Sequence, residues 1–517
     1  MSILSTLSAQ EFNNQLEQWE EQLKLELKLP EVGNKALKKT REGEWPTLSL
    51  TGKAQHLPVK EDWKKASQSY VRINPLKIEQ QLQEDLAAGV RNFFFEKDFL
   101  QAEQWQQIAT VFAKFSHPQE LVIILLGFKE VNFTSTHFKI IDENRVAIGR
   151  TAHDHGGNII QELGLMAFCL IQKIKNPNYD FHLGVFSDSQ FFRNIAKIRA
   201  AKLLGYKILQ EAGIKKELSL IALTSFREWT LYERYSNMLR NDVSVASSFI
   251  AGGDHVQSAG YQSVFELEGL IEENDHSERS LRMARNTSHI LALESMLGVV
   301  QDAAFGSYHL ETLTNYYAEE AWKFMQTLLP LSPVAAYVKE VALKTQELRL
   351  LEVKTRKHVL AGMNDFPDVK ENLNLKENPT YRFFRIAHSF EALRLKMEKV
   401  KRPEVYVALF GDYAALNGRL NFVKNYFELL GIKVRDPEHS QNDREAFKKD
   451  LSSRNEEIIV LCASDKDYPE LLDYVKDVKQ EVKFMAGKFE INGFKNLFAG
   501  QNIYQVLKEI ANRWGSK

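Results

Sequence analysis

Two histidines, His153 and His155, flank Asp154 in a short polar stretch of the chain. Imidazoles spaced two positions apart on a loop can chelate a metal ion. A tetrahedral zinc site needs about four ligands drawn from histidine, cysteine and carboxylate side chains. Neither a cysteine nor a cluster of carboxylates accompanies the two histidines, so we predict that this stretch holds no metal.

A second stretch with possible chemistry is 411–418 (GDYAALNG), which has a glycine at each end and follows an apolar run. Glycine-rich loops of this kind can cradle phosphates. The Walker loop, however, ends in Gly-Lys-Ser or Gly-Lys-Thr, and this stretch does not. We therefore predict no nucleotide-phosphate site, and we expect Asp412 and Gly418 to act as turn-forming residues.

The composition is that of an ordinary globular protein. A chain of 517 residues is too long for one core and predicts two or three domains. Its 67 basic and 68 acidic side chains give a net charge of −1, which indicates no affinity for nucleic acid or an anionic membrane. Two cysteines, Cys169 and Cys462, cannot form a disulfide framework. With no signal peptide recognisable at residues 1–5 and no apolar span, these features predict a cytoplasmic protein.

Short apolar runs alternate with longer helical stretches from about residue 46 to residue 335. The runs lack period-two alternation, as expected for strands that are buried on both faces of a parallel sheet. Helical segments such as 191–213 separate them. This repetition predicts an α/β fold, a closed (β/α)8 TIM-type barrel. The clearest runs are 92–95, 121–126, 181–186 and 218–223.

Two further segments follow the predicted barrel. Residues 336–402 are charged and mainly of helical pattern, and we expect them to be a helical connector. Residues 403–517 read as alternating strands and helices and predict a flavodoxin-like parallel sheet. The predicted strands are 405–410, 432–434, 457–462 and 482–485, and the predicted helices are 420–430 and 504–514.

The first 45 residues are predicted to form an N-terminal helical arm. Leu16, Trp19 and Leu23 lie among Glu, Gln and Lys in residues 9–29, at roughly helical spacing. An amphipathic helix needs a surface to cover. The arm can pack on its own barrel or wrap around a partner subunit, and the pattern leaves both open.

Several ordered motifs resemble one enzyme family. They are 195–201 (IAKIRAA), 284–287 (ARNT), 306–313 (GSYHLETL), Ala321-Trp322, and 356–364 (RKHVLAGMN) in the connector. In this order they resemble the cobalamin-dependent acyl-CoA mutases, the methylmalonyl-CoA mutase family. The resemblance covers most of residues 150–517. It implies a barrel that holds a CoA ester and a C-terminal domain of the cobalamin-binding type.

The resemblance also indicates a missing cobalt ligand. The family supplies a histidine from an Asp-x-His-x-x-Gly loop after the first strand of its cobalamin domain. The corresponding loop here contains Gly411, Asp412 and Gly418, and no histidine occurs between residues 403 and 438. Where the family has Ser-x-Leu and Gly-Gly, this chain has 463–465 (ASD) and 486–487 (AG). We therefore expect no cofactor-binding residues on this chain.

The barrel motifs differ from the family in the same way. The family has Gln-Thr-Ser-Gly at one strand end, whereas this chain has Leu223, Thr224, Ser225 and Phe226. A leucine cannot donate a hydrogen bond to a thioester carbonyl. Ser258 stands where the family places a histidine over the migrating carbonyl, and His255 lies three positions too early. We therefore expect no catalytic residues.

Other motif residues are retained. Thr224, Ser225, Arg240, Asn286 and Tyr308 are candidates for the barrel mouth. Roles in stabilising the barrel explain them without any ligand, and for Arg240 the alternative is an ion pair on the barrel rim.

The chain keeps the framework motifs but lacks the cobalt ligand and the residues that contact the substrate. The resemblance therefore implies a particular member of the family: the small, non-catalytic subunit of a heterodimer. A large catalytic subunit would then be the partner and would bind adenosylcobalamin and the acyl-CoA. The complex would be an isomerase of propionate metabolism that interconverts methylmalonyl-CoA and succinyl-CoA. The alternatives are an independently active, divergent cobalamin-dependent mutase, and a non-catalytic docking or regulatory module.

Overall fold

The computed structural model describes residues 144–515 with breaks at 176–179, 271–274, 301, 382, 436–440 and 476–477. Before residue 144 it describes the elements given below and the single positions 18, 21, 22, 25, 90 and 110. The chain divides into two compact units. The first comprises residues 1–224, 243–258 and 285–345, and the second comprises 225–242, 259–284 and 346–517. The division into four segments made from the sequence stays a prediction.

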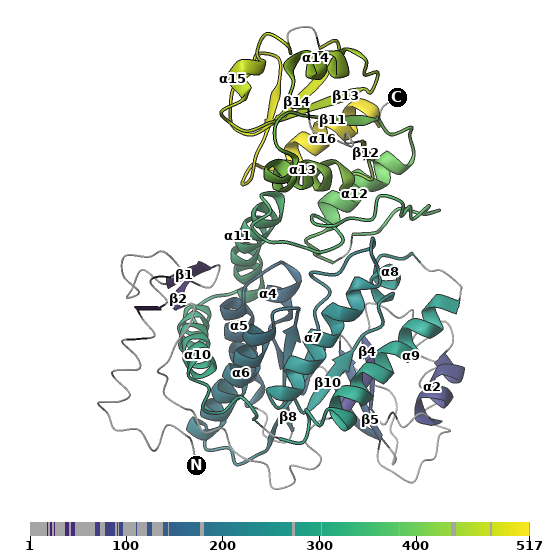
Figure 1. Ribbon diagram of the computed structural model, residues 1–517. Coiled ribbons are helices and arrows are strands. Elements are labelled where there is room, and N and C mark those ends of the chain that lie inside the picture. Colours follow the sequence, from purple (N-terminus) through teal and green to yellow (C-terminus); the bar gives the residue numbers. More distant parts are fainter. Residues whose placement is uncertain are drawn as a thin grey trace. The chain divides into compact units, whose positions relative to one another are not determined.

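The first unit is built on an eight-stranded sheet in which all neighbouring strands are parallel (Figure 1). Four of its strands confirm the predicted apolar runs. The strand order is β6-β5-β4-β3-β10-β9-β8-β7. The strands are β3 (Gln68–Arg72), β4 (Asn92–Glu96), β5 (Leu121–Leu126), β6 (Phe138–Asp142), β7 (Val146–Ile148), β8 (Phe181–Ser187), β9 (Leu218–Thr224) and β10 (His255–Ser258).

The two edge strands of this sheet are neighbours in the sequence. Only residues 143–145 join β6 to β7, and the amide of Arg145 donates to the carbonyl of Asp142 at 3.0 Å. A crossover between adjacent parallel strands needs about a dozen residues, so β6 and β7 follow one another along one path. The sheet therefore curves, so that its two edge strands lie at the two ends of this short linker. No ladder joins β6 to β7 within the part of the chain that the structure describes.

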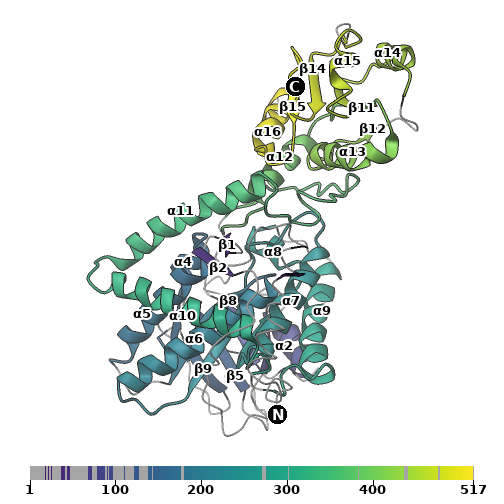
Figure 2. The ribbon, with the colours of Figure 1, turned by 60° about the vertical axis from the view of Figure 1, so that its left-hand side comes forward.

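The curved sheet has an apolar interior and a layer of helices outside. Side chains from six different strands, β4 to β9, meet in one buried cluster on the inner face, which is the expected filling of a strongly curved sheet. The opposite faces of β8 and β9 pack against α5 (Ile159–Lys173), α6 (Phe191–Glu211) and α10 (Tyr308–Leu328), which lie side by side (Figure 2). The inner cluster comprises Phe94, Val122, Ile124, Ile141, Val146, Phe186, Ile221 and Leu223.

The remaining elements outside the C-terminal sheet are short or connect the parts just described. They are β1 (Leu37–Thr40), β2 (Gly43–Pro46), α2 (Ile78–Ala87), α4 (Arg150–Asp154), α7 (Ser236–Ile250), α8 (Ser263–Leu267), α9 (Asp275–His289), the π-helix η6 (Ile290–Glu294), α11 (Val334–Lys354) and α12 (His388–Glu398). None of the helices in the described part of the chain combines the length and apolarity needed to cross a bilayer.

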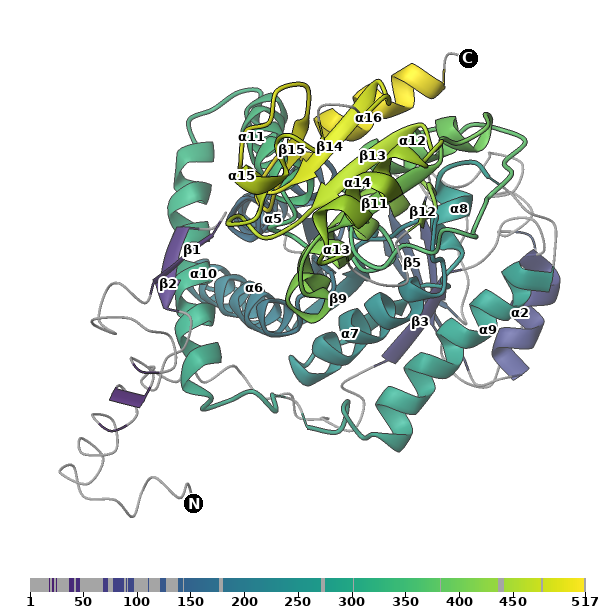
Figure 3. The same ribbon diagram turned by 45° about the horizontal axis from the view of Figure 1, so that its top comes forward.

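The second unit contains a five-stranded parallel sheet of order β12-β11-β13-β14-β15, whose strands lie side by side in Figure 3. Helices α12, α13 and α16 cover one face, and α14 and α15 cover the other. The strands are β11 (Val405–Leu409), β12 (Val434–Arg435), β13 (Ile458–Cys462), β14 (Val482–Ala486) and β15 (Lys495–Leu497). The helices are α13 (Tyr413–Glu428), α14 (Arg444–Ser452), α15 (Tyr468–Leu471) and α16 (Ile503–Trp514).

Two expectations about the elements were wrong, and one lies mostly outside the described residues. The connector is helical only at its ends, because residues 355–387 contain no helix among the described positions. Helix α13 begins at Tyr413, seven residues before the predicted start, because Asp412 caps it. Of the predicted arm, Gln18, Glu21, Gln22 and Leu25 are helical and exposed, whereas Leu16, Trp19 and Leu23 lie outside the described residues.

Candidate functional site

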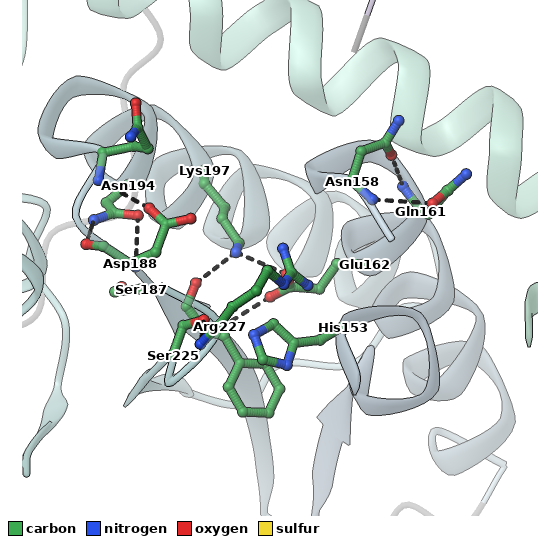
Figure 4. A network of polar contacts seen from close by, with 12 residues as sticks. His153, Asn158, Gln161, Glu162, Ser187, Asp188, Asn194, Lys197, Ser225 and Arg227 are labelled. Carbon is green, nitrogen blue, oxygen red and sulfur yellow. Dashed lines mark hydrogen bonds and ion pairs between the residues drawn. The ribbon is translucent and has the colours of Figure 1, made fainter. Parts of the chain in front are cut away.

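Helix α6, which carries the first family motif, places three basic side chains inside the first unit. Lys197, Arg199 and Lys202 are each at most 5% exposed. Lys197 Nζ donates to Glu162 Oε2 at 2.7 Å and to the carbonyl of Phe186 (Figure 4). Glu162 Oε1 in turn accepts the amide of Phe186 at 2.9 Å. This bridge fixes the end of β8 against α5 and α6.

Arg199 joins two of the family motifs. Its Nη2 donates to Glu311 Oε1 at 2.7 Å, and its Nε donates to both oxygens of Asp302 at 3.1 Å. Its Nη1 donates to Thr314 Oγ1 at 3.0 Å. Glu311 also accepts the amide of Gly306 at 3.0 Å. The Arg199 and Glu311 side chains are fully buried, so these motifs meet to hold the fold together and present no charge to a ligand.

The inner face of the curved sheet offers no group for acyl-CoA chemistry at Leu223. This side chain is 2% exposed and belongs to the cluster that fills the interior. Phe226, which stands where the family has glycine, belongs to the second unit and packs edge-to-face on Trp229 with ring centroids 4.8 Å apart. The interior at Leu223 is therefore closed by strand side chains.

The next candidates, Thr224 and Ser258, end their strands and are buried. Thr224 Oγ1 donates to the carbonyl of Gln257, and its amide donates to Gln257 Oε1, both at 3.0 Å. Val256 packs in the helix-facing cluster. Successive side chains of a strand alternate between faces, so Ser258 shares the helix-facing side of β10 with Val256. Gln257 takes the inner side.

Ser225 and Arg240 lie in the second unit. Ser225 is buried, and its Oγ accepts the amide of Arg227 at 3.4 Å. Arg240 donates from Nη1 to Asn237 Oδ1 at 2.7 Å and to Thr230 Oγ1 at 3.1 Å, and from Nη2 to the carbonyl of Ala361 at 2.7 Å. All these acceptors are neutral, so none of them forms the ion pair named as the alternative for Arg240. Burial lowers the pKa of Arg240 to about 10, partly offset by Glu228 and Glu391.

Asn286 and Tyr308 both lie in helices. Asn286 is exposed on α9, while its neighbour Arg285 donates to Asp85 Oδ1 at 2.5 Å. Tyr308 is partly buried at the start of α10, and its carbonyl accepts Thr312 Oγ1. Both residues occupy helix positions in the framework of the chain.

The two histidines that could chelate a metal have other contacts. The His153 ring stacks on Phe186 with centroids 3.7 Å apart, and its Nδ1 lies 3.0 Å from Asp154 Oδ1. His155 Nδ1 lies 2.9 Å from the carbonyl of Thr151. The described residues contain no group of three or more His, Cys, Asp or Glu side chains placed to hold a metal ion.

In the five-stranded sheet, the ends of β11 and β13 form the place where ligands bind in doubly wound folds, because the strand order reverses between them. Gly411 follows β11 with φ of 113°, a backbone conformation that favours glycine. Asp412 was predicted in a turn and instead caps α13 by accepting the amide of Ala415 at 3.0 Å. Gly418 lies inside α13, so its prediction as a turn residue was wrong.

Side chains of the chain itself occupy this strand-end position. Arg419 Nη1 lies 2.5 Å from the carbonyl of Ala463, 3.2 Å from the carbonyl of Ala486 and 2.9 Å from Asp465 Oδ1. The Tyr468 hydroxyl donates to the same Ala486 carbonyl at 2.7 Å and accepts the amide of Ala463 at 3.1 Å. The polar backbone groups at the ends of β13 and β14 therefore have internal partners.

These residues do not fit a cobalamin. The loop after β11 contains no histidine between residues 403 and 438, and α13 already begins at Tyr413, where the family has its ligand loop. Asp465 adds a carboxylate beside Gly487, where a Cβ atom would lie 3.3 Å from Asp465 Oδ1. Cys462, the nearest thiol, is buried, and burial raises its pKa to about 12, so it offers no thiolate.

A further network in the second unit was not found from the sequence. The buried Arg385 donates to Glu391 at 2.8 Å and to Glu268 at 2.9 Å. His388 Nε2 lies 2.7 Å from Glu268, and Glu391 accepts the amide of Leu231 at 2.8 Å. Burial lowers the pKa of His388, partly offset by its hydrogen bond to Glu268. Arg385 and Glu268 lie 117 positions apart in the chain, so no local spacing could have indicated the network.

Comparison with known proteins gives a consistent result. The family model described as Methylmalonyl-CoA mutase matches residues 177–402. A relative named "Methylmalonyl-CoA mutase small subunit" from Porphyromonas gingivalis is 28% identical over 424 residues, which is 73% of this chain and 66% of the relative. The protein of the same name from Propionibacterium freudenreichii subsp. shermanii is 27% identical over 58% of this chain and 49% of its own length.

A protein named "Methylmalonyl-CoA mutase" from Cereibacter sphaeroides is 28% identical over 44% of this chain and 34% of its own length. The chain spans between about half and two thirds of the length of the small subunits that it matches. Several similar relatives thus carry the same small-subunit name, and the family model covers the motifs of α6, α9, α10 and the connector. Residues 177–402 match the methylmalonyl-CoA mutase family model, and the chain resembles the small subunits of that family.

Proposed function

We propose that this chain is the non-catalytic small subunit of a heterodimeric methylmalonyl-CoA mutase, an isomerase. Its partner is a large subunit that binds adenosylcobalamin and the acyl-CoA and interconverts methylmalonyl-CoA and succinyl-CoA. The small subunit stabilises the large one by covering a surface that would otherwise face water. We place the complex in the cytoplasm, in propionate metabolism.

The observation that carries the proposal is the occupied strand end of the five-stranded sheet. Arg419 and Tyr468 make there the hydrogen bonds that an entering ligand would have to replace. A ligand gains little by displacing well-made internal hydrogen bonds, because each exchange is nearly neutral. A domain whose own side chains bond the polar groups at the strand ends, where a ligand would bind, fits a subunit that lacks the cofactor.

The fold that goes with this proposal is a TIM-type barrel followed by a flavodoxin-like domain of the cobalamin-binding type. The interior cluster, drawn from six strands, and the linker between β6 and β7 support the barrel. The strand order of the second sheet is the flavodoxin-like order 2-1-3-4-5 and supports the second assignment. Leu223 within the packed interior supports a barrel that no longer admits an acyl-CoA.

Co-expression with the catalytic large subunit from the same genome tests the proposal. We expect a 1:1 complex in size-exclusion chromatography. We expect the chain alone to keep no corrin absorbance after incubation with adenosylcobalamin and desalting. The complex should also raise the unfolding free energy of the large subunit, by about 2.7 kcal/mol when the chain is at 100 times its Kd.

The two alternatives give different results. A stoichiometric corrin band on the chain alone would favour an independently active mutase and contradict the proposal. A large subunit that is equally stable and active with and without the chain would favour a docking or regulatory module.

A further inference from the structure

The segment between α9 and α10 exposes a row of apolar side chains. We call the six residues Ile290, Leu293, Met296, Val299, Val300 and Phe305 the outer apolar segment; they are 41–70% exposed. Leu293 and Met296 are the most exposed, at 70% and 65%. Single exposed apolar residues are ordinary, but a continuous group of this kind marks an interaction surface.

Neighbouring residues that pack on the core hold the outer apolar segment in place. Leu291, Ala292 and Leu297, which alternate with the exposed residues, pack against the core of the first unit. The π-helix η6 is closed by the amide of Ser295, which donates to the carbonyl of Ile290 at 2.8 Å. Asp302, which precedes Phe305, is bonded through both oxygens to Arg199. The exposed side chains are therefore presented by a fixed backbone, which lowers the entropy lost on binding.

One backbone position in the segment is strained. Met296 has φ of 53°, in the left-handed region that costs a residue with a Cβ atom about 1–2 kcal/mol. Such outliers persist where the surrounding structure or a function requires them. The strained residue is also one of the two most exposed apolar side chains of the segment.

The charges around the segment restrict what can bind to it. Residues 286–322 contain no Lys or Arg, although basic residues make up 67 of the 517. Glu294 is exposed within the segment, while Asp302 is engaged by Arg199. An anionic membrane attracts basic side chains, so it does not fit this surface. A second copy that met the segment about a two-fold axis through Glu294 would bring the two Glu294 carboxylates together, which is repulsive.

We propose that the outer apolar segment is the surface on which this chain binds its large mutase subunit. The large subunit meets it with apolar side chains bordered by Lys or Arg, which complement Glu294. This inference rests on the proposed function and adds to it the location and the chemistry of the contact.

Two substitutions at one position test both parts of the inference. Leu293→Lys and Leu293→Glu remove the same apolar side chain but add opposite charges. Because the partner surface is basic, Leu293→Lys should weaken the complex with the large subunit at least tenfold more than Leu293→Glu does. The matched control is Leu329→Lys at the end of α10, where the leucine is 52% exposed in the same unit. The control should bind as the unsubstituted chain does.

Binding is measured by titrating each full-length variant against the purified large subunit, and thermal unfolding of each variant is recorded alongside. Leu293 is largely exposed, so its substitutions should leave the chain's own unfolding midpoint unchanged. Equal affinity of all variants would overturn the inference while leaving the proposed function intact. Weaker binding by Leu293→Glu than by Leu293→Lys would contradict the inference that Lys or Arg residues of the large subunit border the contact.

Two further outcomes concern the occupant. Self-association of the unsubstituted chain that Leu293→Lys abolishes would assign the surface to a second copy and overturn the inference. If the unsubstituted chain forms no complex with the large subunit, the proposed function fails, and the occupant named here fails with it.

Discussion

Replacing Arg199 with methionine should destabilise the first unit strongly. The side chain is fully buried and joins α6 to Glu311, Asp302 and Thr314. Methionine keeps an apolar stem like that of arginine but lacks the guanidinium, so the loss is mainly that of the ion pairs and hydrogen bonds. Glu311 is also fully buried, and after the substitution its carboxylate keeps the amide of Gly306 but loses its cation.

The magnitude follows from this uncompensated charge. Removing one partner of a buried ion pair costs about 3–5 kcal/mol, because the remaining ion stays out of water. Asp302 adds less, since it is 15% exposed, and burial already raises its pKa against the opposing effect of Arg199. Removing the second charge should restore part of the loss, so the double variant Arg199→Met with Glu311→Gln should be more stable than Arg199→Met alone.

Urea unfolding followed by far-UV circular dichroism measures the effect as a shift of the transition in which the first unit unfolds. A chain with two units need not unfold in one step. Lys323→Met on α10 is the matched control in the same unit, since the pair Lys323–Glu320 is exposed and should contribute little. A loss for Arg199→Met as small as that of the control would refute the reasoning. So would a double variant that is less stable than Arg199→Met.

Three further predictions concern other parts of the molecule. The free energy of unfolding should fall as the pH drops below about 6.5, because burial lowers the pKa of His388 and the unfolded chain then binds a proton that the folded chain does not. In His388→Gln the thermal midpoint should therefore fall less between pH 7 and pH 5.5. An unchanged dependence of the midpoint on pH would contradict this. Arg419→Met should lower the unfolding free energy of the second unit by about 1–3 kcal/mol, measured by urea unfolding, because the carbonyls of Ala463 and Ala486 lose a donor. The variant should still retain no adenosylcobalamin after desalting. A red complex would show that Arg419 alone had blocked the site. Calorimetry with methylmalonyl-CoA should detect no binding near 1 μM, about 8 kcal/mol, because Leu223 is packed into the interior of the sheet.

The strands were largely predictable because burial on both faces leaves continuous apolar runs. Residues 121–126, 181–186 and 457–462 all became strands within one residue of their predicted bounds. Short strands without such runs were missed. The strand β10 contains His255, Gln257 and Ser258, whose polar groups are satisfied by tertiary contacts that no local pattern shows.

The sequence indicated which residues stand at the candidate sites, but not which other residues they contact. The missing histidine after β11 could be read directly from the sequence. That Arg419 fills the strand end could not, because it depends on carbonyls 44 and 67 residues further along the chain. Asp412 was expected in a turn and instead caps α13, since the same short carboxylate serves both structures. Thr224 and Ser225 were grouped as neighbours in sequence, yet they fall in different compact units.

The linker between β6 and β7 has a consequence for aggregation. A parallel sheet with two free edges can template pairing with strands of other molecules, and natural sheets avoid long exposed edges. Here three residues, 143–145, join the two edge strands, of which β6 pairs with β5 and β7 pairs with β8. A linker of this length keeps the edge strands β6 and β7 close together. Inserting a flexible segment between Asn144 and Arg145 would let the two edge strands separate, expose both edges and make the chain prone to aggregate.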